Sequence, residues 1–167
     1  MILIIDNHDS FTYNLVQYVG KLSNNMLVIK NDQMIINNID FSNISHIIIS
    51  PGPGRPEDSK LSLDIIDYAK HNPLPLLGIC LGHQAIAYKY NAKITNAQYV
   101  MHGKVSTVSR KGESKILYNI NKSFKATRYH SLVIAPNSLS SEFNITSYSD
   151  DNEIMSIEHK KLPLYGV

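Results

Sequence analysis

The sequence lacks the features that define several large classes of protein. It contains one cysteine, which excludes a disulfide framework within the chain and a zinc site built from several cysteines. No apolar run approaches the roughly 18 residues of a membrane span. The short run Ile2–Ile5 ends at Asp6, so it does not have the length of a signal peptide either. With only 8 glycines and 7 prolines, collagen-like and low-complexity chains are excluded as well.

An excess of charge of one sign is also missing. The 16 Lys and Arg residues nearly balance the 14 Asp and Glu residues, which leaves a net charge of +2. This balance does not favour binding to nucleic acid or to an anionic membrane. The 167 residues are 43% hydrophobic, which is enough for one core. We therefore expect a single domain over residues 1–167 in a reducing compartment, either the cytoplasm or another such as a plastid stroma.

Apolar segments and helix-like segments alternate in the first part of the chain. Buried strands are predicted at Ile2–Ile5, Met26–Ile29, His46–Ile49 and Leu74–Ile79. Helices are predicted between them: one capped by Ser10 with an apolar face of Phe11, Leu15, Tyr18 and Leu22, one with Leu61, Ile65 and Ile66 at helical spacing, and one over Gly82–Tyr90. This succession indicates a parallel sheet that is covered by helices on both faces.

The pattern changes after Ala92. Hydrophobic and polar residues alternate in Lys104–Ser109, Asn144–Tyr148 and Ile154–His159, with turn-forming residues between these segments. We expect short, partly antiparallel strands beside the first sheet. The predicted fold class is therefore α/β with three layers: a mostly parallel central sheet, helices on both faces, and additional short antiparallel strands in the C-terminal half.

The one cysteine follows a predicted strand and precedes a predicted helix. Gly78 and Gly82, two residues to either side of Cys80, would let the backbone turn sharply and lift the thiol above the sheet edge, as in a nucleophile elbow. The helix N-terminus is expected to lower the pKa of the Cys80 thiol, and the backbone N–H of Leu81 is free to bind an oxyanion. A buried structural cysteine is the alternative interpretation.

A second glycine-rich turn, Pro51-Gly52-Pro53-Gly54, also follows a predicted strand. Because the carboxyl ends of parallel strands meet at one edge of the sheet, we expect this turn beside Cys80, in the crevice where α/β folds bind ligands. Its backbone N–H groups could then share an oxyanion with Leu81. Taken alone, the turn could equally be a rigid connection.

Five segments, in order along the chain, resemble a known family. They are Asp6–Leu15, Ser50–Gly54, Gly78–Gln84, Met101–Lys104 and Arg128–Leu132. The sequence resembles the class I, or triad-type, glutamine amidotransferases, and in particular the small subunits of anthranilate synthase and para-aminobenzoate (aminodeoxychorismate) synthase. The resemblance covers essentially the whole chain. It implies a flavodoxin-like three-layer fold, with no cofactor and no metal.

The resemblance also implies a role for each matching residue. Cys80 would attack the side-chain amide of L-glutamine, form a γ-glutamyl thioester and release ammonia. The residues implied in binding glutamine or its oxyanion are Gly52, Pro53, Gly54, Leu81, Gln84, Ser131 and Leu132. The residues implied at an interface with a partner subunit are Asp9, Ser10, Thr12, His102 and Lys104. Without the resemblance, Ser10 would be a helix cap, and His102 and Lys104 a solvated turn.

The implied function is that of a subunit that hydrolyses L-glutamine and delivers ammonia to a large, chorismate-binding synthase subunit. Anthranilate synthase component II is the leading interpretation. Para-aminobenzoate synthase component II is the alternative, because the aromatic chemistry takes place on the partner. Two further interpretations stay open: a non-catalytic structural subunit, and an unrelated cysteine hydrolase, which would leave Asp6–Leu15 unexplained.

The sequence departs from the family at the expected catalytic base. The family carries a His-Pro-Glu segment shortly after a Gly-Val pair, and here Gly166-Val167 ends the sequence. None of the 7 histidines matches that segment. His83 is expected to face away from the thiol, His130 to have a binding or structural role, and His159 to be exposed. We expect a domain truncated before His-Pro-Glu, with little or no glutaminase activity.

Overall fold

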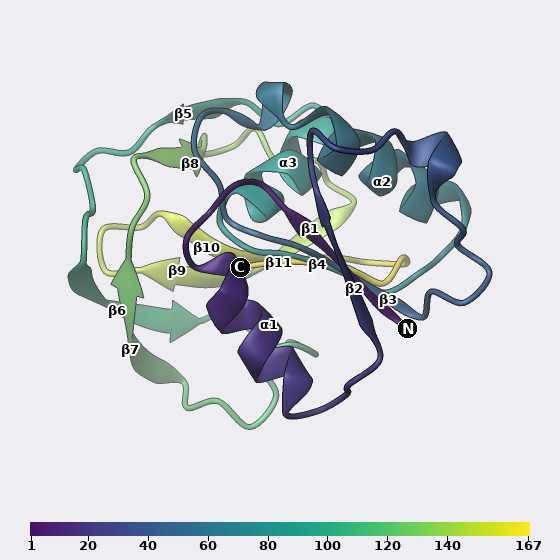
Figure 1. The fold of residues 1–167 in the computed structure, drawn as a ribbon. Helices are drawn as coiled ribbons and strands as arrows, with labels where there is room; N and C mark the ends of the chain where they lie inside the picture. Colours follow the sequence, from purple (N-terminus) through teal and green to yellow (C-terminus); the bar gives the residue numbers. More distant parts are fainter.

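The computed structural model describes residues 1–167, and its main element is a 9-stranded sheet (Figure 1). The strands are, in spatial order, β2 (Met26–Lys30), β1 (Ile2–Asp6), β3 (His46–Ile49), β4 (Leu76–Gly78), β11 (Leu164–Gly166), β10 (Ile154–His159), β9 (Phe143–Ser149), β6 (Lys104–Arg110) and β7 (Ser123–Arg128). The other two strands, β5 (Ile94–Asn96) and β8 (Leu132–Ile134), form a separate antiparallel pair.

Helices lie on both faces of the sheet. α1 (Thr12–Gly20) covers one face, and α2 (Lys60–His71) and α3 (Leu81–Lys89) cover the other (Figure 1). Two short 3-10 helices, η1 (Ile36–Asn38) and η2 (Pro56–Asp58), lie in the connections. The strands from β2 to β11 in the order above pair in parallel, which confirms the predicted architecture. None of the helices has the length and the apolar character that crossing a membrane would require.

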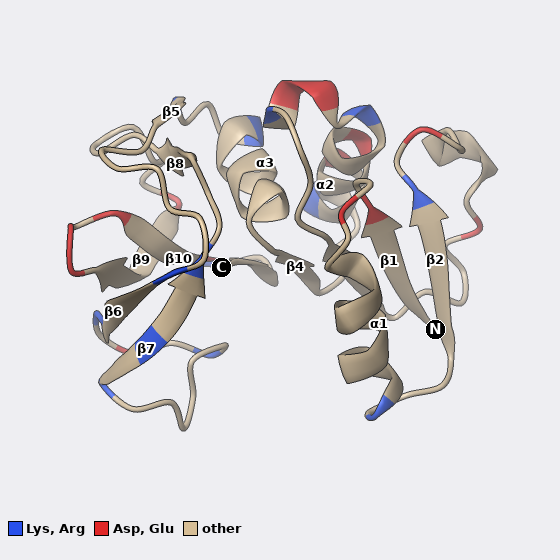
Figure 2. Ribbon diagram, turned by 60° about the vertical axis from the view of Figure 1, so that its left-hand side comes forward, with Lys and Arg blue, Asp and Glu red and all other residues tan.

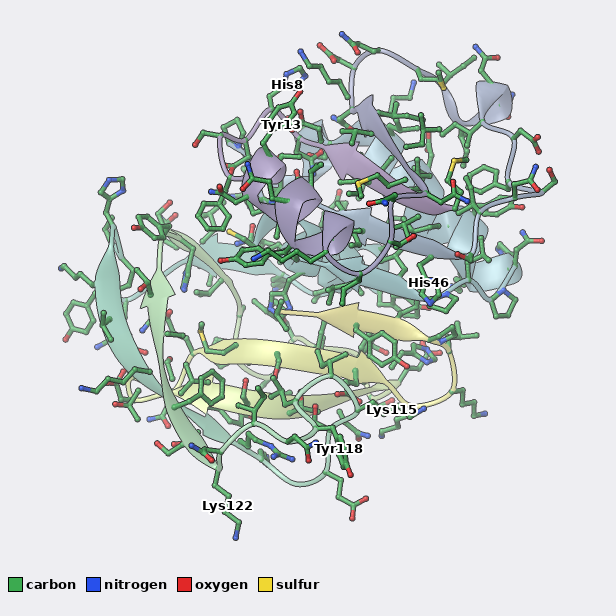
Figure 3. The ribbon with its side chains drawn as sticks, turned by 60° about the horizontal axis from the view of Figure 1, so that its bottom comes forward. His8, Tyr13, His46, Lys115, Tyr118 and Lys122 are labelled. Carbon is green, nitrogen blue, oxygen red and sulfur yellow. The ribbon has the colours of Figure 1, made fainter.

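The C-terminal half is antiparallel, as predicted. β10 pairs antiparallel with both β11 and β9, and β6 pairs antiparallel with both β9 and β7. β7 and the β5–β8 pair are not among the predicted strands, although Phe124 and Ala126 of β7 alternate with polar residues. Lys115, Tyr118 and Lys122 project outward from the connection between β6 and β7 (Figure 3).

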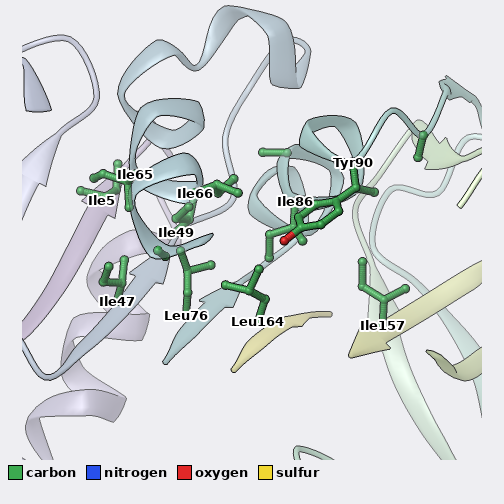
Figure 4. Close-up of a cluster of buried hydrophobic side chains, with 14 of the residues drawn as sticks. Ile5, Ile47, Ile49, Ile65, Ile66, Leu76, Ile86, Tyr90, Ile157 and Leu164 are labelled. Carbon is green, nitrogen blue, oxygen red and sulfur yellow. The ribbon is translucent and has the colours of Figure 1, made fainter. Parts of the chain in front are cut away.

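The largest part of the core lies between the parallel strands and the helices α2 and α3. Ile5 and Ile49 from the strands, and Ile65 and Ile66 from α2, belong to one cluster in which each of these side chains is 0% exposed (Figure 4). Full burial of one such side chain contributes about 1.5–3 kcal/mol. This layer therefore fixes the ends of β1, β3 and β4, where the predicted functional turns begin.

α1 packs differently from the prediction. Of the residues expected to form its apolar face, Phe11 is 50%, Tyr18 63% and Leu22 89% exposed. The helix contains no charged residue, so it is uncoloured along its length in Figure 2. Ser10 does not cap it: the N-cap residue is Phe11, and no side chain caps the helix. The carboxylate of Asp9 accepts the N–H of Phe11 at 2.8 Å. Three of the four residues of the predicted apolar face thus lie on an exposed surface, and the fourth, Leu15, is half-buried.

Candidate active site

Cys80 lies at the turn between β4 and α3, at the N-cap position of the helix. Its φ of 52° lies in the left-handed region, which non-glycine residues rarely adopt. A Cβ on Gly78 would stand 2.4 Å from the backbone of Gly82, and a Cβ on Gly82 would stand 2.6 Å from the carbonyl oxygen of Ile49. Glycine is therefore required at both positions, since β4, α3 and β3 approach one another too closely here for a side chain. This confirms the predicted elbow.

Hydrogen bonds from neighbouring strands hold the elbow in place. The N–H of Ile79 donates to the carbonyl of Ile49 at 2.9 Å, and the N–H of Cys80 donates to the carbonyl of Val167 at 2.8 Å. Val167 in turn donates to the carbonyl of Gly78 at 3.0 Å. The strained turn persists because β3 on one side and the end of β11 on the other over-determine it.

A cavity of about 700 Å³ opens beside Cys80. Gly52 from the Pro-Gly turn, Gln84 from α3 and Leu132 from β8 line it together with Cys80. The two glycine-containing turns thus share one edge of the parallel sheet, as predicted. Residues to which the sequence analysis assigns no role complete the wall, among them Thr127, Arg128, Val133, Ile154 and Met155.

Asn7 fixes the Pro-Gly turn to the end of β1. Its side-chain N–H donates to the carbonyl of Ser50 at 3.0 Å, and its side-chain oxygen accepts the hydroxyl of Ser62 at 2.9 Å. Its backbone N–H donates to the hydroxyl of Ser50 at 2.9 Å. A Cβ on Gly52 would stand 2.5 Å from the Cβ of Asn7, so only glycine fits above it.

Gln84 lies one helical turn after Cys80 and reaches the cavity, as its spacing predicts. It is 5% exposed, which excludes the alternative of a helix-surface glutamine. Its Nε2 donates to the carbonyl of Leu132 at 2.9 Å. Gln84 therefore joins α3 to β8 across the cavity.

Comparison with known proteins identifies the family. Residues 3–167 match the family described as "Glutamine amidotransferase class-I". The chain belongs to this family. It is 48% identical over 171 residues to anthranilate synthase component 2 of Saccharolobus solfataricus, covering 99% of this chain and 86% of the relative. It is 44% identical over 167 residues to aminodeoxychorismate synthase component 2 of Escherichia coli, covering 100% of this chain and 88% of the relative.

A solved structure confirms the amidotransferase fold. A glutamine amidotransferase from Thermotoga maritima superimposes with a TM-score of 0.80, and the match covers 99% of this chain and 73% of that chain. The two sequences are only 15% identical. The likeness therefore supports the predicted three-layer arrangement and the antiparallel C-terminal part, and nothing more specific.

The amidotransferase cavity does not include every residue that the resemblance implies. Pro53, Gly54, Leu81 and Ser131 do not line it. Pro53, Gly54 and Ser131 are exposed, and the carbonyl of Ser131 accepts the N–H of Ala97 at 2.8 Å. The side chain of Leu81 is buried, while its backbone N–H faces the thiol of Cys80. Their roles in binding glutamine stay predictions.

The pKa of the Cys80 thiol shifts in the direction opposite to the prediction. Burial raises the pKa above its ordinary value, the N–H of Leu81 opposes this, and the Asp9 carboxylate raises it further. The expectation of a lowered pKa is therefore wrong, because removal from water outweighs the helix N-terminus. An amidotransferase with this thiol needs a base to form the thiolate at neutral pH.

Three histidines, His83, His102 and His130, line the cavity with Cys80. Neither ring nitrogen of His83 has a hydrogen bond of ordinary geometry. Burial and nearby His130 lower the pKa of His83 to about 4, although backbone groups of Gly166 and Ile154 oppose this shift. Nε2 of His130 accepts the Nε–H of Arg128 at 3.1 Å, and its Nδ1 has no partner. The ring of His102 packs on Tyr129. None of the three rings is hydrogen-bonded to the sulfur, and none is oriented as a general base.

His159 is not exposed, in contrast to the prediction. The residue is 8% exposed, and its ring packs against Tyr90 and Phe143. Its Nδ1 accepts the N–H groups of Lys161 and Leu162 at 3.1 and 2.9 Å. The adjacent lysines suggested a solvated strand end, but the ring instead fills the core and caps the turn into β11.

Three of the five residues implied at the partner interface line the cavity. Asp9, Ser10 and His102 line the cavity, and Lys104 is exposed at the start of β6. Thr12 is 0% exposed, and its hydroxyl donates to Asp6 Oδ1 at 2.8 Å. Thr12 therefore supports the loop from inside and does not lie on a surface that a partner can contact.

Arg128 is a cavity residue to which the sequence analysis assigns no role. Its side chain is 0% exposed and forms ion pairs with Asp151, at 2.8 Å, and with Glu153. These carboxylates lie 23 and 25 residues further along the chain. Arg128 lies in one of the five segments that carry the resemblance. No local sequence pattern shows, however, that strand pairing brings its guanidinium to Asp151 and Glu153.

Proposed function

We propose that this chain hydrolyses L-glutamine at Cys80 and delivers the ammonia to a large chorismate-binding subunit, as component 2 of an anthranilate synthase. The observation that carries the proposal is the shared cavity: the elbow thiol, the Gly52 turn and Gln84 face one space of about 700 Å³. A pocket of this size beside the nucleophile of a family member suits a small-molecule substrate.

The reaction follows from the geometry of the elbow. The Cys80 thiolate attacks the side-chain amide carbon of glutamine, and the tetrahedral oxyanion accepts hydrogen bonds from the N–H of Leu81 and from the Gly52 turn. Ammonia leaves with the proton that the thiol gave up, and a γ-glutamyl thioester remains. Water then cleaves the thioester, which yields glutamate and restores the thiol. A thiol nucleophile fits a reducing compartment such as the cytoplasm.

We infer further that the 167-residue polypeptide alone releases ammonia slowly. Burial raises the pKa of the Cys80 thiol, and none of the three cavity histidines is hydrogen-bonded to the sulfur. Without an oriented base, the thiolate and the protonated leaving group both form rarely. Ammonia release per Cys80 as fast as that of a relative tested in parallel would contradict this.

A partner subunit is the expected acceptor of the ammonia. The relatives named above are each a component 2, a name that implies a component 1. The proposed interface is the rim of the cavity, which is lined by Asp9, Ser10, His102 and the exposed ring of Phe11. It would extend to Lys104, which is exposed at the start of β6. Contact there would cover the cavity mouth and shield ammonia from water.

The alternative acceptor is the large subunit of para-aminobenzoate (aminodeoxychorismate) synthase. The similarity to the Escherichia coli aminodeoxychorismate synthase component 2 supports this alternative. Mixing the protein with either large subunit, chorismate and glutamine separates the two. Formation of anthranilate supports the proposal, whereas a chain that supports only aminodeoxychorismate formation contradicts it.

The experiment that tests the glutamine site is covalent labelling of Cys80. A diazoketone analogue of L-glutamine should add to Cys80, as peptide mass spectrometry detects, and free L-glutamine should protect it. Cys80→Ser is the control that removes the label, and iodoacetamide measures whether the thiol is accessible at all. Iodoacetamide labelling without analogue labelling would indicate a non-catalytic subunit. Analogue labelling that glutamine does not slow would indicate a hydrolase of another class.

A further inference from the structure

We propose that Arg128 is a positioning residue for the glutamine pocket. It holds the segment Arg128–Leu132, which forms one wall of the cavity beside Cys80, in the arrangement that binds the substrate. The inference rests on the proposed function and assigns to that same site a residue outside the set implied by the resemblance.

The guanidinium of Arg128 uses each of its three nitrogens. Nη1 donates to Ser106 Oγ at 3.0 Å and to Asp151 Oδ1 at 2.8 Å, and Nη2 donates to Glu153 Oε2. Nε donates to His130 Nε2 at 3.1 Å. Only a planar fork can reach a hydroxyl, two carboxylates and a ring at once. The fully buried side chain thereby joins β6, β7 and the turn between β9 and β10 to the cavity wall.

The wall that Arg128 supports has little regular structure of its own. β7 ends at Arg128 and β8 begins at Leu132, so residues 129–131 belong to no strand. One side-chain hydrogen bond reaches these residues, the bond from Arg128 to His130. Beyond that, the wall is held by backbone bonds, such as the N–H of Ala97 to the carbonyl of Ser131 at 2.8 Å. Loss of the guanidinium bond should therefore loosen the wall before it loosens the sheet.

The wall reaches the substrate site through Leu132. Its carbonyl accepts Nε2 of Gln84, one turn after Cys80 on α3, at 2.9 Å. Arg128 and His130 themselves line the cavity. A shift of this segment would therefore displace Gln84 and change the room for glutamine, while the elbow, which is held by β3 and β11, would stay in place.

The same segment carries the loop implied at the partner interface. The N–H of Met101 donates to the carbonyl of His130 at 3.2 Å, and the N–H of Gly103 donates to the carbonyl of Arg128 at 2.9 Å. The ring of His102 packs on Tyr129 with 5.7 Å between centroids. Residues 101–104 and the glutamine wall are thus one unit around Arg128.

Arg128→Lys separates positioning from charge, because lysine keeps the positive charge opposite Asp151 and Glu153 but cannot form the fork. The full chain is treated with the diazoketone analogue of glutamine, and the rate of Cys80 labelling is followed against analogue concentration. We expect the half-saturating concentration to rise about tenfold, the effect of losing one charge-assisted hydrogen bond. The labelling rate with iodoacetamide, which needs the elbow but not the wall, should not change.

Controls and milder variants keep the test decisive. Arg110→Lys removes the fork of an arginine at the far end of β6, whose Nη1 donates to the carbonyl of Ile120 at 2.6 Å, and should change neither reaction. Ser106→Ala removes one support of Arg128 from outside the cavity and should raise the half-saturating concentration by a smaller factor. If Arg128→Lys does not fold, as thermal unfolding would show, Ser106→Ala decides: an unchanged half-saturating concentration overturns the proposal.

Two results for Arg128→Lys would also overturn it. One is unchanged saturation by the analogue, and the other is an equal loss of labelling by analogue and iodoacetamide, which indicates a general structural role. A wild-type chain that the analogue does not label contradicts the proposed function itself and this inference with it. Labelling of the wild type combined with unchanged saturation in the variant contradicts the inference alone.

Discussion

The parallel and antiparallel halves of the sheet bury different chemistry. Around β1, β3 and α2, side chains such as Ile5, Ile49 and Ile65 are 0% exposed and belong to one aliphatic cluster (Figure 4). The same cluster extends into the antiparallel half through Phe143 and Ile157, but that half also buries the guanidinium of Arg128 and a group of hydroxyls around Ser156. Aliphatic burial has no direction and fixes whole strands, whereas ion pairs and hydrogen bonds fix individual side chains.

The proposed active site takes one wall from each half. The parallel half supplies the elbow, whose thiol is placed by backbone geometry and glycine packing. The antiparallel half supplies the segment Arg128–Leu132, whose side chains are placed by a buried charge network. The two walls should therefore respond differently to substitution, since one depends on packing and the other on paired charges.

The largest effect is expected when charge is removed from the antiparallel half. Arg128→Met keeps side-chain length but leaves Asp151 and Glu153 facing each other without a cation. Breaking a buried pair in this way should lower the free energy of unfolding by about 3–5 kcal/mol. Urea unfolding followed by circular dichroism measures the change, with Arg110→Met as the matched control. A loss of unfolding free energy smaller than that of Arg110→Met would mean that water reaches the carboxylates of Asp151 and Glu153 and replaces the guanidinium.

The next effect is a cavity in the parallel half. Ile65 is 0% exposed in α2, so Ile65→Ala removes buried methyl groups without changing any charge. We expect the free energy of unfolding to fall by about 3 kcal/mol. Ile35→Ala, at a position that is 61% exposed, should change it little. Equal losses for both variants in chemical denaturation would show that the parallel half is not held by its aliphatic cluster.

The packing between α3 and β11, where the two halves meet, should make the stability of the fold decrease at acidic pH. His83 of α3 packs against Gly166 of β11, and burial lowers its pKa from 6.5 to about 4. The unfolded chain therefore binds a proton that the folded chain does not, so stability is full above pH 6.5 and decreases as the pH falls towards about 4. The burial of His130 and of His159 lowers their pKa values and acts in the same direction.

His83→Gln isolates this contribution. In the variant, the loss of unfolding free energy between neutral and acidic pH should be about 2 kcal/mol smaller than in the wild type. His46→Gln, at an exposed position, is the control for replacing a histidine by glutamine. Parallel curves for the wild type and His83→Gln would mean that the ring is protonated in the folded protein.

The predictability of the two halves from sequence differs for the same physical reason. The apolar run His46–Ile49 and the glycine spacing around Cys80 are local patterns, and the structure confirms the strand and the elbow. The network of Arg128 depends on the register of β6, β7 and the β9–β10 turn, which no local pattern contains. The pKa of Cys80 depends on burial, so the helix N-terminus alone predicted the wrong direction.

The smallest effect on the free energy of unfolding is expected from a substitution at the end of α1. Comparing it with a substitution in α2 separates exposed from buried leucine within the parallel half. Helical periodicity marks an apolar face, but it does not show whether another part of the chain covers that face. Leu22, just beyond the end of α1, is 89% exposed, whereas Leu61 of α2 is 2% exposed. Leu22→Ser should therefore change the free energy of unfolding by no more than about 0.5 kcal/mol. Leu61→Ser, measured in the same urea titration, should lower the free energy of unfolding several times more.

A loss for Leu22→Ser that approaches the loss for Leu61→Ser, and that depends on protein concentration, would show that a second copy covers α1. A neutral result means that the side chain of Leu22 does not stabilise the fold.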